Sequence, residues 1–135
     1  MLGRLEHVAL AVADLDAALS HYREVWGLEV SERERVEDQG VEEAMLPLGE
    51  SHIQLLAPTG PDTTVGKFIA RRGEGLHHIA YEVDDLDAVL AELKAKGVRL
   101  IDEAPRRGGR DDMIAFVHPG GNHGLLVELI QRPAS

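Results

Sequence analysis

Two stretches of the sequence that repeat each other decide the fold. The first is LEHVALAVADLDAAL, residues Leu5–Leu19, and the second is LHHIAYEVDDLDAVL, residues Leu76–Leu90. They align without a gap at an offset of 71 residues, and nine of the fifteen pairs are identical, which is far beyond coincidence. Such a repeat indicates that one structural unit occurs twice. The sequence therefore predicts two copies of one unit in a chain of 135 residues, a usual length for a single domain.

Each copy predicts the same order of elements, β-α-β-β-β. An apolar strand, HVALAV or HIAYEV, leads to an aspartate, Asp14 or Asp85, that suits a helix N-cap. Helically spaced apolar residues follow, and Gly27 and Gly97 stand where a helix C-cap is expected. Three further strands complete each copy: Glu29–Val36, Val41–Pro47 and Ser51–Leu56 in the first, and Val98–Asp102, Asp112–His118 and Gly124–Ile130 in the second.

These elements predict an α+β fold, in which tandem βαβββ repeats form one pseudo-symmetric domain with a curved mixed sheet around a metal site. The first repeat covers about residues 4–57 and the second about residues 76–132. Residues 58–75 join the repeats and contain a predicted short helix, Thr63–Arg72, with Asp62 as its cap. We expect the domain to span residues 1–135.

Composition excludes several classes of function. The chain has no cysteine, so a bound metal must take nitrogen and oxygen ligands. A formal net charge of -10 argues against binding to nucleic acid. No apolar run has the length of a membrane span, and because the first patterned segment begins almost at Met1, we expect no signal peptide. We expect a cytoplasmic protein. An anionic substrate would need local cations, for which the candidates are Arg71, Arg72, Arg106, Arg107 and Arg110.

Four polar residues occupy repeat-related positions and are candidate metal ligands. His7 and His78 lie at equivalent places on the first strand of each repeat, and Gln54 and Glu128 lie at equivalent places on the last strand. A single strand histidine is more often a hydrogen-bonded core residue than a ligand. Four polar residues at related places favour a metal, because it offsets the cost of burying a carboxylate. Two imidazoles, an amide oxygen and a carboxylate suit Co²⁺, Mn²⁺, Ni²⁺, Zn²⁺ or Fe²⁺.

The other histidines receive more ordinary interpretations. His77 points to the opposite face from His78, so we expect it to be structural or to orient a ligand. The remaining four are expected on the surface or beside a turn: His21, His52, His118 and His123.

The whole patterned chain resembles the vicinal oxygen chelate superfamily and, within it, the methylmalonyl-CoA epimerases. The segments that carry this resemblance are HVALAV from His7, QGVEE from Gln39, GEGLHHIA from Gly73, and FVHP from Phe116, followed by GLLVEL from Gly124. The resemblance implies the βαβββ–βαβββ fold and the ligands His7, Gln54, His78 and Glu128. It further implies that Glu43 and Glu128 are a pair of acid/base residues, whereas alternation alone does not choose Glu43 over Glu42. Within this family we favour Co²⁺.

The implied reaction is epimerisation of (2R)- and (2S)-methylmalonyl-CoA through an enolate that the metal stabilises. Inversion of a carbon centre needs a proton donor and an acceptor on opposite faces, which explains two carboxylates. The implied partners are a coenzyme A thioester and a second copy of the chain in a homodimer. Around Lys67–Arg72 and Arg106–Arg110, basic residues are candidate anchors for the coenzyme A tail.

Two departures and two alternatives accompany this interpretation. Gly120 and Gly121 stand where the family often has a basic residue and a serine, and Arg110-Asp111-Asp112 replaces a more neutral stretch. The first alternative function is a glyoxalase I-like lyase or isomerase with a similar ligand set. The second is a metal-free binding protein of the same fold, which would not need all four ligands. An extradiol dioxygenase would need two histidines and one carboxylate, and Gln54 argues against it.

Overall fold

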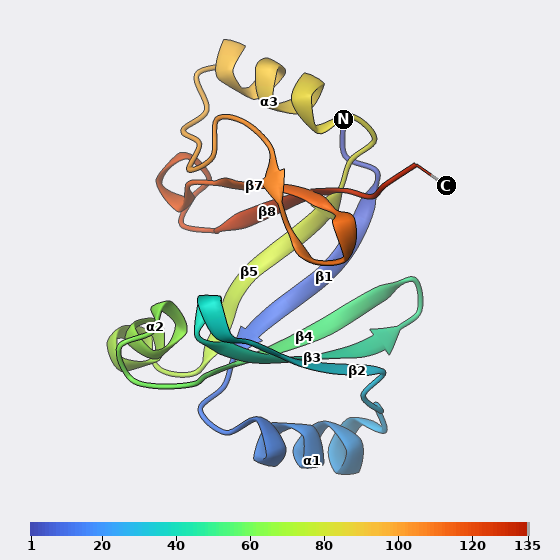
Figure 1. Ribbon diagram of the computed structural model, residues 1–135, viewed down its shortest axis with the longest axis vertical. Coiled ribbons are helices and arrows are strands. Elements are labelled where there is room, and N and C mark those ends of the chain that lie inside the picture. The colour runs from blue at the N-terminus through green and yellow to red at the C-terminus, as the bar shows by residue number, and fades with distance from the viewer. Residues whose placement is uncertain (135) are drawn as a thin grey trace. The chain divides into compact units, whose positions relative to one another are not determined.

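Each repeat folds into one small sheet with one helix packed across it (Figure 1). The computed structural model describes residues 1–134, and these form two compact units. The N-terminal unit is His7–His77, and the C-terminal unit combines Met1–Glu6 with the chain from His78 onward. The chain passes from one unit to the other within its first strand, β1 (Arg4–Ala11), and again within β5 (Gly75–Glu82).

The N-terminal unit has the strand order β2-β3-β4-β1, in which β1 pairs with β4 in parallel and the other pairs are antiparallel. Its strands after β1 are β2 (Glu32–Val36), β3 (Val41–Leu48) and β4 (Ser51–Pro58). Helix α1 (Leu15–Trp26) packs against one face of this sheet, on Ala44, Leu46, Leu55 and Ala57. Because strand side chains alternate, Gln54 lies on the opposite face.

The C-terminal unit repeats this plan with the strand order β5-β8-β7-β6. Strands β5 and β8 pair in parallel, and the other pairs are antiparallel. The strands after β5 are β6 (Arg106–Arg107), β7 (Met113–Val117) and β8 (Val127–Gln131). Helix α3 (Leu86–Ala95) packs on a core that includes Ala115, Val117, Val127 and Leu129, so Glu128 lies on the face away from the helix. We call the face of each sheet that carries Gln54 or Glu128 the ligand face.

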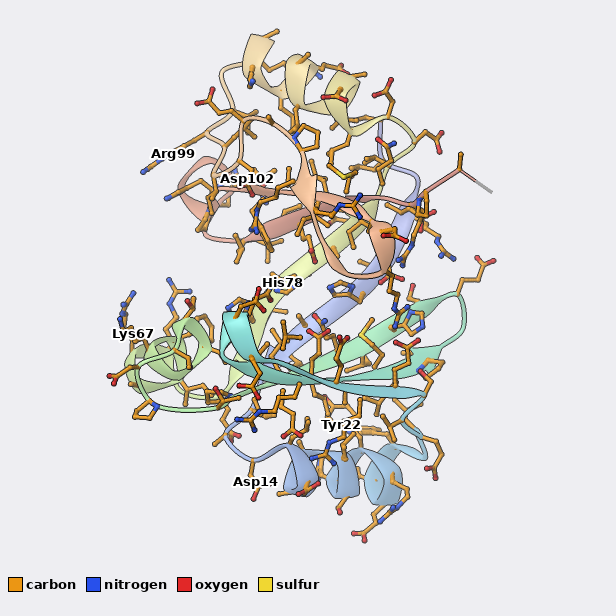
Figure 2. All side chains as sticks on the ribbon, viewed as in Figure 1. Asp14, Tyr22, Lys67, His78, Arg99 and Asp102 are labelled. Atoms are coloured by element: carbon orange, nitrogen blue, oxygen red, sulfur yellow. The ribbon has the colours of Figure 1, made fainter. Side chains whose placement is uncertain are left out.

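The register of the strands repeats the internal symmetry of the sequence. Gln54 on β4 stands beside Ala9 of β1 and Met45 of β3. Glu128 on β8 stands beside Ala80 of β5 and Phe116 of β7. The two aspartates act as predicted N-caps, because Asp14 accepts a hydrogen bond from the Ala17 N–H and Asp85 accepts one from the Ala88 N–H (Figure 2 labels Asp14).

Several predicted boundaries are wrong. The strand predicted over Val98–Asp102 is reduced to a single bridge between Leu100 and Val117. The cause is a contact with β7: the Ile101 and Asp102 N–H groups both donate to the Phe116 carbonyl, and the Asp102 carboxylate accepts the Phe116 N–H. A side chain therefore takes the place of the strand pairing, and the two-residue β6 forms the edge instead.

The linker helix and two further strands also differ from the prediction. Helix α2 (Thr64–Arg72) begins one residue late, and its cap is Thr63 rather than Asp62, because Thr63 Oγ1 accepts the Gly66 N–H at 3.0 Å. The strand predicted from Glu29 starts at Glu32, and the strand predicted from Gly124 starts at Val127. Gly27 caps α1 as predicted, whereas Lys96 caps α3 and Gly97 follows it with a positive φ of 76°. Among residues 1–134, no helix is long and apolar enough to cross a membrane.

Candidate active site

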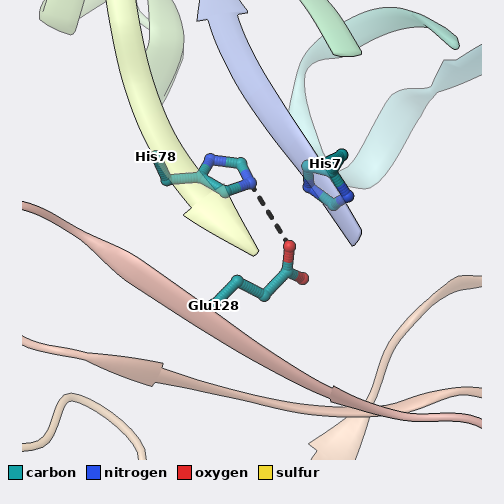
Figure 3. A group of neighbouring side chains, drawn as sticks. All are labelled: His7, His78 and Glu128. Atoms are coloured by element: carbon teal, nitrogen blue, oxygen red, sulfur yellow. Dashed lines mark ion pairs between the residues drawn. The ribbon is translucent and has the colours of Figure 1, made fainter. Parts of the chain in front are cut away.

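The C-terminal unit contributes a buried imidazole and carboxylate in direct contact. His78 Nε2 lies 3.2 Å from Glu128 Oε1, and the side chains are only 6% and 12% exposed (Figure 3). Two adjacent ligands on one octahedral ion, each bonded at about 2.1 Å, stand roughly 3 Å apart. The spacing of this pair therefore fits two donors that share one divalent ion.

In the N-terminal unit, the side-chain amide of Gln54 has a buried oxygen that is available as a ligand. The Gln54 side chain donates a hydrogen bond from Nε2 to Glu43 Oε2 at 3.3 Å. A carboxylate can only accept, so the amide nitrogen faces Glu43 and the amide oxygen faces elsewhere. That oxygen, Gln54 Oε1, is buried and has no hydrogen-bond partner among the described residues. An unpaired buried acceptor is costly, and a cation would remove the cost.

His7 completes the predicted set. It is 4% exposed and lies on β1, in register with His52 of β4. The boundaries between the two units fall directly before His7 and directly before His78. The two predicted histidine ligands therefore stand at the two places where the chain passes between units. Imidazole nitrogen, amide oxygen and carboxylate oxygen together are donors that a borderline divalent ion accepts.

The two neighbouring glutamates of β3 have different surroundings. Glu43 shares the ligand face with Gln54, from which it accepts its hydrogen bond. Glu42 points the other way and pairs with Arg33, whose Nη2 lies 3.3 Å from Glu42 Oε2. Glu43 is therefore the glutamate of this strand that lies beside a candidate ligand, while Glu42 belongs to an exposed ion pair.

The predicted cations lie on different units. Lys67, Arg71 and Arg72 are exposed on α2 of the N-terminal unit (Figure 2 labels Lys67). In the C-terminal unit, Arg106 pairs with Asp102 at 3.1 Å and Arg107 pairs with Asp111 at 2.9 Å.

Phe116 is a neighbour of the candidate ligands that sequence reasoning missed. It is the register partner of Glu128, and its ring meets the His78 ring edge-on at 5.8 Å between centroids. The Arg106 guanidinium lies over the same ring, 5.4 Å from its centroid. The repeat could have indicated this position. Phe116 aligns with Met45 at the 71-residue offset, and each of the two is the register partner of a candidate ligand, Glu128 or Gln54.

The other histidines divide into structural and exposed residues. His77 contacts the Phe68 ring of α2 at 4.8 Å between centroids. His118 caps a short turn by accepting the Gly120 N–H on its Nδ1 at 2.8 Å. His21 is exposed as predicted, whereas His52, also predicted on the surface, is half-buried beside His7.

Comparison with known proteins identifies the family. The family model described as the Glyoxalase/Bleomycin resistance protein/Dioxygenase superfamily matches residues 6–116. An ethylmalonyl-CoA/methylmalonyl-CoA epimerase of Cereibacter sphaeroides is 39% identical over 133 residues, which cover 97% of this chain and 99% of the relative.

Solved structures agree with this match. A variant of Streptomyces coelicolor methylmalonyl-CoA epimerase in complex with 2-nitronate-propionyl-CoA superposes with a TM-score of 0.91 at 45% identity, covering 99% of this chain and 97% of that one. A methylmalonyl-CoA epimerase in complex with methylmalonyl-CoA and NH₄⁺ gives a TM-score of 0.90, also at 45% identity and with the same coverage. The chain therefore belongs to the glyoxalase, bleomycin resistance protein and dioxygenase superfamily and, within it, to the family of the methylmalonyl-CoA epimerases.

Proposed function

We propose that this protein interconverts the two epimers of methylmalonyl-CoA by moving the proton on the carbon between the thioester and the carboxylate. Family membership supports the reaction, and the coenzyme A thioesters bound to its structural relatives support the substrate class. The observation that carries the proposal is the contact between Glu43 and Gln54. This contact supports the proposal because the amide nitrogen of Gln54 donates to the Glu43 carboxylate, while the buried amide oxygen has no hydrogen-bond partner among the described residues and suits a cation.

The proposed metal ligands are His7, Gln54, His78 and Glu128, on one divalent ion for each chain. The contact between His78 and Glu128 supports this set, as does the unpaired oxygen of Gln54. The ion would supply Lewis acidity to the thioester and carboxylate oxygens of the substrate and so make the adjacent proton easier to remove. Co²⁺ remains the favoured ion, with Mn²⁺, Ni²⁺, Zn²⁺ and Fe²⁺ as alternatives.

The proposed proton-transfer residues are Glu43 and Glu128. In one direction, a carboxylate oxygen of Glu43 accepts the proton as the C–H bond breaks, and the electron pair moves onto the thioester carbonyl to form the substrate enolate. Glu128, which must carry a proton at the start of this direction, then releases it to form the new C–H bond on the opposite face, and exchange with solvent returns both carboxyls to their starting states. In the reverse direction the two residues exchange roles, because the reaction is reversible and each must act as acid and base.

Binding of the coenzyme A tail is proposed for basic residues of the α2 region, Lys67–Arg72, and of the Arg106–Arg110 segment. Both groups carry exposed guanidinium groups, which suit phosphate. Remote binding energy of this kind is used at the reacting carbon, so free methylmalonate should be a poor substrate. A homodimer and a cytoplasmic location stay predictions of the sequence.

The test is incorporation of deuterium into methylmalonyl-CoA in heavy water. Protein loaded with Co²⁺ should catalyse both exchange of the proton and interconversion of the epimers, and a chelator should abolish both. Free methylmalonate and a glutathione hemithioacetal serve as comparison substrates.

Equal turnover of the free acid, or efficient turnover of the hemithioacetal, would replace this proposal with another activity of the superfamily. Full exchange in the presence of the chelator, with no metal left by elemental analysis, would remove the ion from the reaction.

A further inference from the structure

One guanidinium in the C-terminal unit contacts carboxylates from three other strands or strand ends. Arg132 follows β8 directly. Its Nη1 lies 2.6 Å from Asp112 Oδ2, its Nη2 lies 3.0 Å from Glu6 Oε2, and its Nε lies 3.6 Å from Glu82 Oε2. Asp112 precedes β7, Glu6 lies on β1, and Glu82 ends β5, so Arg132 joins β8 to three other parts of the unit. We call these four residues the Arg132 cluster.

Two of the three carboxylates in the Arg132 cluster are buried. The Glu6 side chain is 2% exposed and the Asp112 side chain 10%, while Arg132 itself is 31% exposed. Burial raises the pKa of the Asp112 carboxyl, and the positive charge of Arg132 opposes that rise. Buried carboxylates are costly unless they are paired, so the planar, multi-donor fork of the guanidinium suits this place.

The cluster lies at the end of the ligand face, on the same strands as the proposed ligands. Arg132 is four residues past Glu128, and Glu82 is four residues past His78, so each shares a face with its ligand. Four residues of a strand span about 13 Å. An apolar layer of Ala80, Ile114 and Ile130 fills the space between. Glu6 directly precedes the remaining histidine ligand, His7.

In the N-terminal unit, the equivalent end of the ligand face is covered by apolar residues and not by an ionic cluster. Its counterparts of Glu82, Asp112 and Arg132 are Ala11, Val41 and Pro58. Ala11 and Val41 belong to an apolar cluster with residues of α2, which are Val65, Phe68 and Ile69. The C-terminal unit has no counterpart of α2 among its described residues, and there the Arg132 cluster stands in its place. The cluster is therefore a specific addition to one repeat.

We propose that Arg132 is a positioning residue for His78 and Glu128, an inference that rests on the proposed metal site. A one-residue slip of β8 would turn its apolar residues to the wrong face, but a two-residue slip would preserve the alternation. Such a slip would put Ile130 in the place of Glu128. It would also move Arg132 away from its three carboxylates and leave the two buried ones, Glu6 and Asp112, without its charge. The Arg132 cluster thus holds β8 in the register that sets Glu128 against His78.

Cobalt binding by Arg132→Lys tests this role apart from catalysis. Lysine keeps the charge but cannot reach three carboxylates with a planar fork. We expect the variant to fold, to bind Co²⁺ about 10- to 100-fold more weakly, and to show an altered visible spectrum of the bound ion. The matched control is Arg33→Met, which removes another arginine that bridges two carboxylates, Asp16 and Glu42, on the exposed surface of the other unit. It should retain the wild-type dissociation constant and spectrum.

Asp112→Asn provides a second variant that leaves Arg132 two of its carboxylates, in case Arg132→Lys does not fold. It should weaken Co²⁺ binding in the same direction, while the melting temperature of the metal-free protein reports any general loss of stability. Wild-type affinity and spectrum in a folded Arg132→Lys or Asp112→Asn variant would overturn the positioning role, as would equal weakening by Arg33→Met. Failure of the wild-type protein to bind Co²⁺ would instead overturn the metal site, and this role with it.

Discussion

Glu43 illustrates what a single residue contributes and why sequence reasoning alone could not choose it. The four candidate ligands could be predicted because each has a partner at the equivalent place of the other repeat. Glu43 has no polar counterpart in the other repeat, because the equivalent residue is the buried Ile114 of the apolar layer on β7. Only the family resemblance selected it over Glu42. The structure distinguishes them by partner, since Glu43 contacts Gln54 and Glu42 contacts Arg33.

The substitution Glu43→Gln should remove a base while preserving shape and hydrogen bonding. We expect it to retain metal and substrate affinity while kcat falls by about 10²–10⁴-fold, the usual worth of a positioned acid or base. One epimer should still exchange its proton through Glu128, whereas inversion should nearly stop. Deuterium incorporation, measured for each epimer separately, checks this asymmetry.

The matched control is Glu42→Gln, which changes the neighbouring residue of the same strand and should leave kcat within about twofold, as expected for a partner in an exposed ion pair. Wild-type inversion in Glu43→Gln, together with a large loss in Glu42→Gln, would transfer the role to Glu42.

At the scale of elements, the sequence correctly predicted features that a few consecutive residues determine. The prediction failed where a side chain took over a hydrogen bond of the backbone pairing. Both aspartate caps are confirmed, because a cap depends on a few consecutive residues. The predicted strand at Val98–Asp102 is wrong because the Asp102 carboxylate accepts the Phe116 N–H, a bond between residues fourteen apart. Such long-range competition leaves no mark in local periodicity. The predicted start of β3 at Val41, two residues before Glu43, is confirmed, and the carbonyl of the preceding Gly40 accepts the Thr59 N–H.

Gly40→Ala should destabilise the protein more than Gly49→Ala does. Both glycines have a left-handed backbone, with φ of 65° and 60°, so alanine costs about 1–2 kcal/mol at either. A Cβ at Gly40 would also lie 2.5 Å from Thr63 Cγ2, whereas nothing lies within 4 Å at Gly49. We expect an extra cost of about 1–3 kcal/mol for Gly40→Ala from this overpacking.

Urea unfolding of the two variants measures the difference between these costs. Equal losses of stability would show that Thr63 moves aside freely. The double variant Gly40→Ala, Thr63→Ser removes the methyl group and should recover most of the extra cost.

At the scale of the whole chain, the two repeats share their framework and the positions of the candidate ligands, and they differ in a few specific features. Strand order, register and helix placement recur at equivalent positions in both units. The exceptions are Glu43 and α2 in the N-terminal unit and the Arg132 cluster in the C-terminal unit. The division of the chain also departs from the repeat, because Met1–Glu6 belongs to the C-terminal unit. Similarity between the repeats could predict the shared framework, and local pattern could predict α2, but Glu43 and the Arg132 cluster have no partner in the other copy that would reveal them.

The proposed ligand set would make the stability of both units depend on one ion, which yields a prediction for the whole molecule. At a free concentration 100 times its dissociation constant, Co²⁺ should stabilise the folded state by about 2.7 kcal/mol. Hydrogen exchange should then slow in β4 of one unit and in β8 of the other, at one ion per chain by elemental analysis. His7→Ala should weaken binding and remove this protection from both strands, although it leaves His78 and Glu128 intact. The control His21→Ala changes an exposed histidine and should preserve the response. If His7→Ala instead kept the wild-type affinity, the ion would depend on the C-terminal unit alone, and the pseudo-symmetry of the two histidines would have no role in holding it.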